Sequence, residues 1–168
     1  WGRVVKGDYI ECIFENPRDT LRVALALKCF LKYWLESVDA SPVSSKYAFR
    51  SSIGIGKMRI VNRQRDIMDG DAIYIAGRNL SRMSRRQFAC VESYNVPKDV
   101  SDVLSSMYML VDSLVNALSA KQAIVIYYKL LEASEKEISS EIHLSQPAVN
   151  LRAKSGKWDL IEDTVLCW

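Results

Sequence analysis

The sequence predicts an α+β N-terminal domain followed by an all-α domain that contains a helix-turn-helix. Extended and helical patterns alternate over residues 1–97, whereas residues 98–168 show only helical patterns separated by capping residues. Charge divides in the same way, because residues 1–98 carry 17 Lys and Arg against 10 Asp and Glu, and residues 99–168 carry 6 against 10. We place the boundary where Asn95 and Pro97 interrupt the last strand.

The first elements of the N-terminal domain are a strand at residues 4–5, a turn at Gly7 and Asp8, and a strand at residues 9–14. Asn16 and Pro17 then suit the N-cap and first position of a helix. Apolar residues at positions 23, 27, 30, 34 and 38 of this helix predict one face buried on a sheet.

The remaining patterns are a strand at residues 47–56, an extended segment at 57–61, a charged loop at 63–71, a helix at 72–83 and a last strand at 87–94. This order predicts helices on one face of a mostly antiparallel sheet. A ferredoxin-like arrangement fits if a strand and a helix precede Trp1. Since the chain opens directly into a strand, we expect a fragment whose first strand is missing.

The composition excludes several classes of protein. With 168 residues, 49% hydrophobic and 26% charged, the chain is an ordinary globular protein. No apolar window is long enough for a membrane span and no leader is present, which predicts a cytoplasmic protein without a membrane partner. The four cysteines form no C-x-x-C pair, so we expect free buried thiols. A single histidine excludes a histidine metal cluster, and we predict neither a metal nor a cofactor.

Three motifs, "KGDYIE", "RSSIGIG" and "DGDAIYIAGRNL", carry a family resemblance. Over roughly residues 3–94 they make the chain similar to the catalytic domain of class III nucleotidyl cyclases. In that family two aspartates hold two cations against a triphosphate, and a helix carries an asparagine four residues before an arginine that stabilises the transition state. The resemblance implies that Asp8 is the second aspartate and Arg78 the arginine.

The chain departs from the cyclase pattern at two positions. Tyr74 occupies the place of the asparagine, and the first aspartate would lie on a strand before Trp1. Because a tyrosine has no amide nitrogen and one carboxylate does not hold two cations, we predict no catalysis. Two interpretations of Asp8 remain open: an ordinary turn residue, or part of a pocket with Tyr74 and Arg78 for a nucleotide or small-molecule ligand.

Basic residues gather at the end of the predicted helix at 72–83 and just beyond it, at Arg78, Arg82, Arg85 and Arg86. We interpret them as solvated side chains whose aliphatic parts pack on apolar neighbours. The alternative is a set of contacts to DNA phosphates.

The C-terminal domain has the stronger pattern. A long helix over residues 101–118 precedes two capping boxes, Ser119 with Gln122 for a helix at 120–131 and Ser134 with Glu137 for a short helix that ends near Ile142. Ser145 caps the next helix, so residues 134–158 predict a helix, a three-residue turn and a helix. Positions within it are assigned to the core, the helix crossing or a left-handed turn: Ile138, Ser139, Ile142, His143, Leu144, Val149 and Ala153.

The second helix of this motif is the candidate DNA-binding element, with double-stranded DNA as the predicted partner. Residues that share the arc opposite Val149 and Ala153 are Gln146, Pro147, Asn150, Leu151 and Lys154. Asn and Gln pair bidentately with adenine edges, and Ser145, Lys154 and Lys157 suit phosphates. A motif of the same shape that binds protein is the alternative, favoured by the net negative charge of this half.

With "EIHLSQPAVN" as the matching core, this half resembles sigma-factor region 4 and related bacterial helix-turn-helix domains. The order of both halves resembles the SatD family of bacterial proteins. The resemblance implies a DNA-binding, transcriptional regulator with a non-catalytic cyclase-like domain that senses a ligand or forms a homodimer. The alternatives are an active nucleotide-processing enzyme, with its first aspartate on the missing strand, and a protein-binding adaptor.

Overall fold

The protein is described from a computed structural model that covers residues 1–38, 49–62, 64–65, 67–84 and 89–168. The start of the predicted strand at 47–56, the start of the last strand, and Arg85 and Arg86 therefore lie outside the described residues. The strands are β1 (Gly2–Lys6), β2 (Tyr9–Cys12), β3 (Ser51–Ile55), β4 (Met58–Asn62), β5 (Ile67–Gly70) and β6 (Ala89–Ser93). The helices are α1 (Arg18–Val38), α2 (Asp71–Arg82), α3 (Lys98–Asn116), α4 (Ala120–Leu130), α5 (Glu135–Glu141), α6 (Gln146–Ser155) and α7 (Trp158–Cys167).

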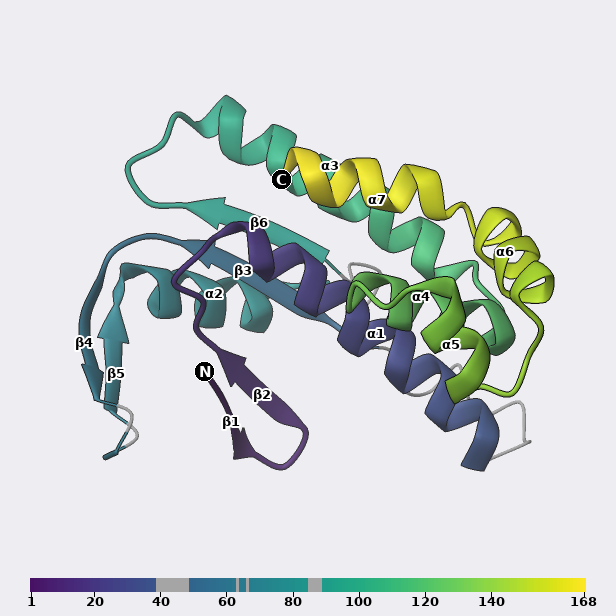
Figure 1. Ribbon diagram of the computed structural model, residues 1–168. Helices are drawn as coiled ribbons and strands as arrows, with labels where there is room; N and C mark the ends of the chain where they lie inside the picture. Colours follow the sequence, from purple (N-terminus) through teal and green to yellow (C-terminus); the bar gives the residue numbers. More distant parts are fainter. Residues whose placement is uncertain (39–48, 63, 66, 85–88) are drawn as a thin grey trace.

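The coarse prediction of an α+β first part and a helical second part is confirmed, but the expected single, mostly antiparallel sheet is not observed. The described strands form three separate two-stranded sheets (Figure 1). β1 with β2 and β4 with β5 are antiparallel, whereas β3 and β6 are parallel. The sequence patterns indicate which segments are extended, but pairing depends on contacts between distant segments, which those patterns do not contain.

The parallel pair β3–β6 is covered on both sides, whereas the order of the sequence patterns predicts helices on one face. Figure 1 shows α2 and α3 on opposite sides of this pair, and the two helices pack on β3 and β6 respectively. Gly54 allows α2 to approach closely, since a Cβ at this position would lie 2.1 Å from the Ala72 carbonyl oxygen. The "IGIG" motif is therefore a packing requirement in this structure.

The charged segment at 63–71, predicted to be a loop, contains β5. Asn62 pairs with Ile67 and Met58 with Gly70, with an irregular register between Met58 and Ile60. The segment is polar because the ribbon is largely exposed. Its strand conformation depends on hydrogen bonds from β4, which the local composition does not reveal.

The buried face of α1 differs from the predicted one. Of the predicted residues, Val23 and Leu27 are half-buried, Phe30 and Trp34 are exposed, and the side chain at position 38 is outside the described ones. The buried apolar residues of α1 are Leu21, Leu25, Ala26 and Cys29. Because the helix carries apolar residues on two faces, periodicity alone does not select the face that tertiary packing buries.

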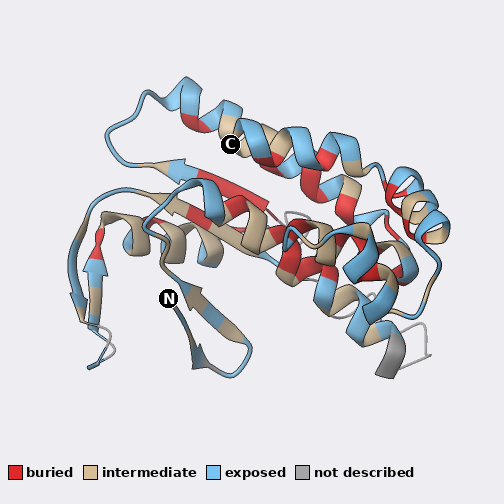
Figure 2. Ribbon diagram, viewed as in Figure 1, coloured by how far each residue is buried: buried red, intermediate tan, exposed pale blue. Residues whose placement is uncertain are grey.

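One hydrophobic core extends across the predicted domain boundary at residue 97. Its buried side chains come from both segments, and Figure 2 shows them gathered between α1, α3, α4 and the β3–β6 pair. The members with the lowest exposure include Leu21, Leu25, Tyr108, Val115 and Ile126. The connection between β6 and α3 falls at the predicted boundary, yet the segments on either side of it pack as one body.

The last helix, α7, has no counterpart in the sequence analysis. Ile161 and Val165 are buried in the shared core. The indole nitrogen of Trp168 donates to the Pro17 carbonyl oxygen at 3.2 Å, and its ring lies edge-on to Tyr108 with centroids 6.3 Å apart. The end of the chain is thereby attached to the start of α1.

All four cysteines are free, as predicted, but only two are buried. Cys29 and Cys90 lie in the interior, and burial raises the pKa of the Cys29 thiol to about 12. Cys12 and Cys167 are exposed, which corrects the expectation of buried thiols at these two positions.

Within the described ranges, no helix combines the length and apolar character needed to cross a bilayer.

An ion pair lies inside the interface of α1 and α3. The Lys28 ammonium contacts an Asp112 carboxylate oxygen, and both side chains are buried. The other Asp112 oxygen accepts from the Asn116 amide at 3.0 Å. Burial is the main cause that lowers the pKa of Lys28, and the Asp112 contact opposes that shift. The pair therefore depends on both partners being present.

We expect Asp112→Ala to lower the free energy of unfolding by about 3–5 kcal/mol, because the buried Lys28 charge loses its neutralising carboxylate. Chemical denaturation measures the change. Asp102→Ala, at an exposed position of the same helix, is the matched control and should have little effect. A double replacement, Lys28→Met with Asp112→Leu, should recover most of the loss. If Asp112→Ala and Asp102→Ala have equal free energies of unfolding, the buried ion pair has no role in stability.

Candidate nucleic-acid interface

The first helix of the predicted motif begins as the sequence indicates. The Glu137 backbone amide donates to Ser134 Oγ at 3.3 Å, and the Ser134 amide donates to Glu137 Oε2 at 2.8 Å. The equivalent box at Ser119 and Gln122 starts α4, with distances of 3.3 and 2.8 Å. Both capping boxes are confirmed, and they fix where α4 and α5 start.

The turn between α5 and α6 also has the predicted geometry. His143 adopts a left-handed backbone with φ of 53°, and the Ser139 hydroxyl donates to the Leu144 carbonyl oxygen across the turn. Ser145 then caps α6 by accepting the Ala148 backbone amide at 3.4 Å. These contacts set the direction in which α6 leaves α5.

A small core of four buried residues holds the motif together: Val125, Ile138, Val149 and Ala153. Half-buried Ile142, Leu144 and Trp158 pack against it. The inward face of α6 is therefore the predicted one. The opposite side of the helix is turned to solvent.

The residues exposed on α6 include most of the predicted contact set. Gln146, Pro147, Leu151 and Lys154 are exposed on this helix, and we call these four residues the α6 face. Leu151 is 68% exposed, which is high for a leucine. Ser145 and Lys157 are exposed at the two ends of the helix, and Lys157 has a left-handed backbone with φ of 59° at the start of α7. The structure thus brings these predicted residues together.

Asn150 differs from its neighbours, because its side chain is half-buried and forms a hydrogen bond within the protein. Its amide nitrogen donates to Glu135 Oε1 at 3.0 Å, and the same oxygen lies 3.5 Å from the Lys129 ammonium. This hydrogen bond, with smaller effects of Lys129 and Lys154, lowers the pKa of Glu135. The prediction considers only the face of the second helix, and Glu135 belongs to α5. Asn150 can therefore contact a base only after its hydrogen bond to Glu135 is broken.

Of the N-terminal candidate residues, Asp8 lies in a turn and the others lie on α2. Asp8 is exposed in the turn between β1 and β2, where Gly7 has φ of 57°. On α2 the Arg78 guanidinium stacks 4.2 Å from the ring centroid of Tyr74, which is 64% exposed. Arg82 is exposed near the end of the same helix. Among the described residues, no group of three or more His, Cys, Asp or Glu side chains is arranged to hold a metal ion.

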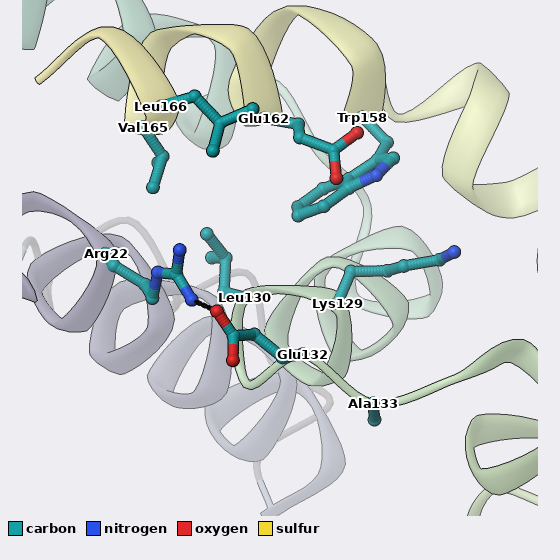
Figure 3. A pocket seen from close by; sticks show the side chains of 9 residues that line it. All are labelled: Arg22, Lys129, Leu130, Glu132, Ala133, Trp158, Glu162, Val165 and Leu166. Atoms are coloured by element: carbon teal, nitrogen blue, oxygen red, sulfur yellow. Dashed lines mark hydrogen bonds and ion pairs between the residues drawn. The ribbon is translucent and has the colours of Figure 1, made fainter.

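A groove that sequence reasoning missed lies between α1, α4 and α7, with a volume of about 310 Å³ (Figure 3). Arg22 and Glu132 form an ion pair on one side, and Trp158 lies on the other. A second hollow of about 300 Å³ is lined partly by Glu132, Glu137 and Glu141. Neither contains Asp8, Tyr74 or Arg78. Grooves formed by helices distant in sequence leave no local signal.

Comparison with known proteins adds no further assignment. No protein-family model matches the chain, and neither the curated proteins nor the solved structures include a significant match.

The left-handed turn at His143 leads to a stability prediction. We expect His143→Gly to leave stability unchanged or raise it, whereas His143→Val should lower it by about 1–2 kcal/mol, because a β-branched residue is strained at this backbone angle. Thermal unfolding measures both. Ser140→Val, at an exposed position of α5 without the positive φ, is the control. A Val variant at position 143 as stable as the Gly variant would contradict the turn geometry.

Proposed function

We propose that this chain is a bacterial DNA-binding transcriptional regulator that presents the α6 face to the major groove of double-stranded DNA. The supporting observation is the geometry of α6. Val149 and Ala153 fix one side of the helix in a small core, and a capped turn precedes it, so Gln146 and Lys154 extend from the other side. Glutamine reads base edges and lysine binds phosphates. This is the arrangement in which helix-turn-helix proteins dock on DNA.

In this proposal the N-terminal part is a non-catalytic, cyclase-like domain that senses a nucleotide or small molecule, or that forms homodimers. The departure at Tyr74 supports the loss of catalysis, because its ring stacks on Arg78 where an active site would need an amide. The exposed position of Asp8 in a turn accords with the interpretation as a turn residue. Manganese-dependent turnover of ATP or GTP would instead support the nucleotide-processing alternative.

The second candidate function is a protein-binding adaptor, and two observations favour it. Leu151 is an exposed apolar side chain in the middle of the α6 face, and leucine is rarer than polar residues in direct base contact. Glu135 adds a negative charge beside Asn150 and opposes the approach of phosphates. Salt-dependent DNA binding distinguishes the regulator from the adaptor.

We expect the chain to bind mixed duplex DNA with an affinity that falls as salt rises, since Lys154 and Lys157 replace counterions on phosphates. Fluorescence anisotropy across a salt series measures the affinity. A Gln146→Ala, Lys154→Ala variant should bind more weakly, and the slope of log affinity against log salt should decrease by about 1 for the lost lysine.

The matched control is Lys98→Ala, which removes the same charge at the first residue of α3. Figure 1 shows the N-terminal end of α3 away from α6. This variant should keep the slope of the unaltered chain. If the chain does not bind DNA even at low salt, the proposal is wrong and the adaptor alternative gains support. If Lys98→Ala has as large an effect as the double variant, binding depends on net charge and not on the α6 face.

A further inference from the structure

Helix α3 carries a second apolar face in addition to the one that enters the core. Tyr108, Val111 and Val115 are buried against the rest of the molecule. The apolar residues on the adjoining side are Val100, Val103, Met107, Leu110 and Leu114, which we call the α3 stripe. Val100, Val103 and Leu110 are exposed, with Val103 at 66% and Leu110 at 70%, whereas Met107 and Leu114 are half-buried. Exposed apolar residues aligned in this way mark an interaction surface.

The spacing within the α3 stripe indicates what kind of partner fits. Its members follow one another at intervals of three, four, three and four residues, which is the repeat of the a and d positions in a coiled coil. The stripe covers four turns of helix, about 21 Å. A seam of this type is completed by another helix with the same repeat, and α3 of a second copy provides one.

Charge at the edges of the stripe indicates the orientation. Ser106 and Ser113 flank its middle and end, whereas Asp99 and Asp102 lie near its N-terminal end. A parallel pair would bring the aspartates of both copies to the same end of the seam, which is unfavourable. An antiparallel pair separates them to opposite ends of the seam.

We propose that two copies of this chain associate through their α3 stripes, with the helices antiparallel and crossing at Met107. Because residues 103 and 110 are four and three positions from Met107, Val103 of each copy then faces Leu110 of the other. Val100 and Leu114, both seven positions away, face each other in the same manner. Away from the crossing point, the smaller residue meets the larger one at each level, which fills the seam evenly.

The association has a consequence for DNA that rests on the proposed function. Helix α3 is followed by only three residues before α4, and α4 packs on α6. The paired α3 helices therefore carry two α6 faces related by a two-fold axis. Such a pair suits an inverted repeat in DNA.

Sedimentation equilibrium of the full chain without DNA tests the association, so its outcome does not depend on DNA binding. We expect a monomer–dimer equilibrium whose dissociation constant rises more than about tenfold in Leu110→Glu, which places a charge in the seam. Met109→Glu, at an exposed position of α3 outside the stripe, should leave the equilibrium unchanged. A chain that is monomeric at every concentration, or a dimer that Leu110→Glu does not weaken, would overturn the proposal.

Thiol cross-linking tests the orientation. In a background with the exposed cysteines replaced, Cys12→Ser and Cys167→Ser, Met107→Cys should form a disulfide between copies because this residue lies at the crossing point. Leu110→Cys should not, because it faces Val103. Equal cross-linking at positions 107 and 110 would contradict the antiparallel arrangement. Unchanged thermal unfolding of each variant verifies that it is folded.

Discussion

Burial of one side of α1 joins the N-terminal part of the chain to the helices that follow it. Leu21, Leu25 and Cys29 pack into a core shared with α3, α4 and the β3–β6 pair. Full burial of each such side chain contributes about 1.5–3 kcal/mol. Among the described elements, α1 makes its most extensive contact with α4, which belongs to the other segment of the chain. Because α4 is held on α1, the position of the helix-turn-helix is fixed relative to the N-terminal part. Helix α6 packs on α4 in turn.

The features predicted correctly from sequence are those determined by neighbouring residues. Ser134 and Glu137 form a capping box because the two side chains lie three residues apart, and His143 adopts the left-handed turn between two capped helices. The features that could not be predicted depend on distant contacts. The face of α1 that is buried, the strand β5 and the parallel pairing of β3 with β6 are all decided by partners elsewhere in the chain.

The same distinction applies to the candidate sites. The α6 face follows from helical geometry once Val149 and Ala153 are assigned to the core, and the structure places both there. The bond between Asn150 and Glu135 joins two helices and is not visible from either alone. At the N-terminal end, the resemblance relates Asp8 and Arg78 to one active site. The structure shows Asp8 in the turn between β1 and β2, and Arg78 stacked on Tyr74 in α2.

The α6 face is the surface that we propose to meet DNA. The most direct test is an amide ¹H–¹⁵N correlation spectrum of the ¹⁵N-labelled chain, titrated with a short duplex at low salt. If the α6 face meets DNA, the largest shift changes fall on residues 145–154, with small changes around Asp8 and Arg78. Changes concentrated on α2 or the β1–β2 turn, or none at a concentration at which anisotropy detects binding, would contradict it.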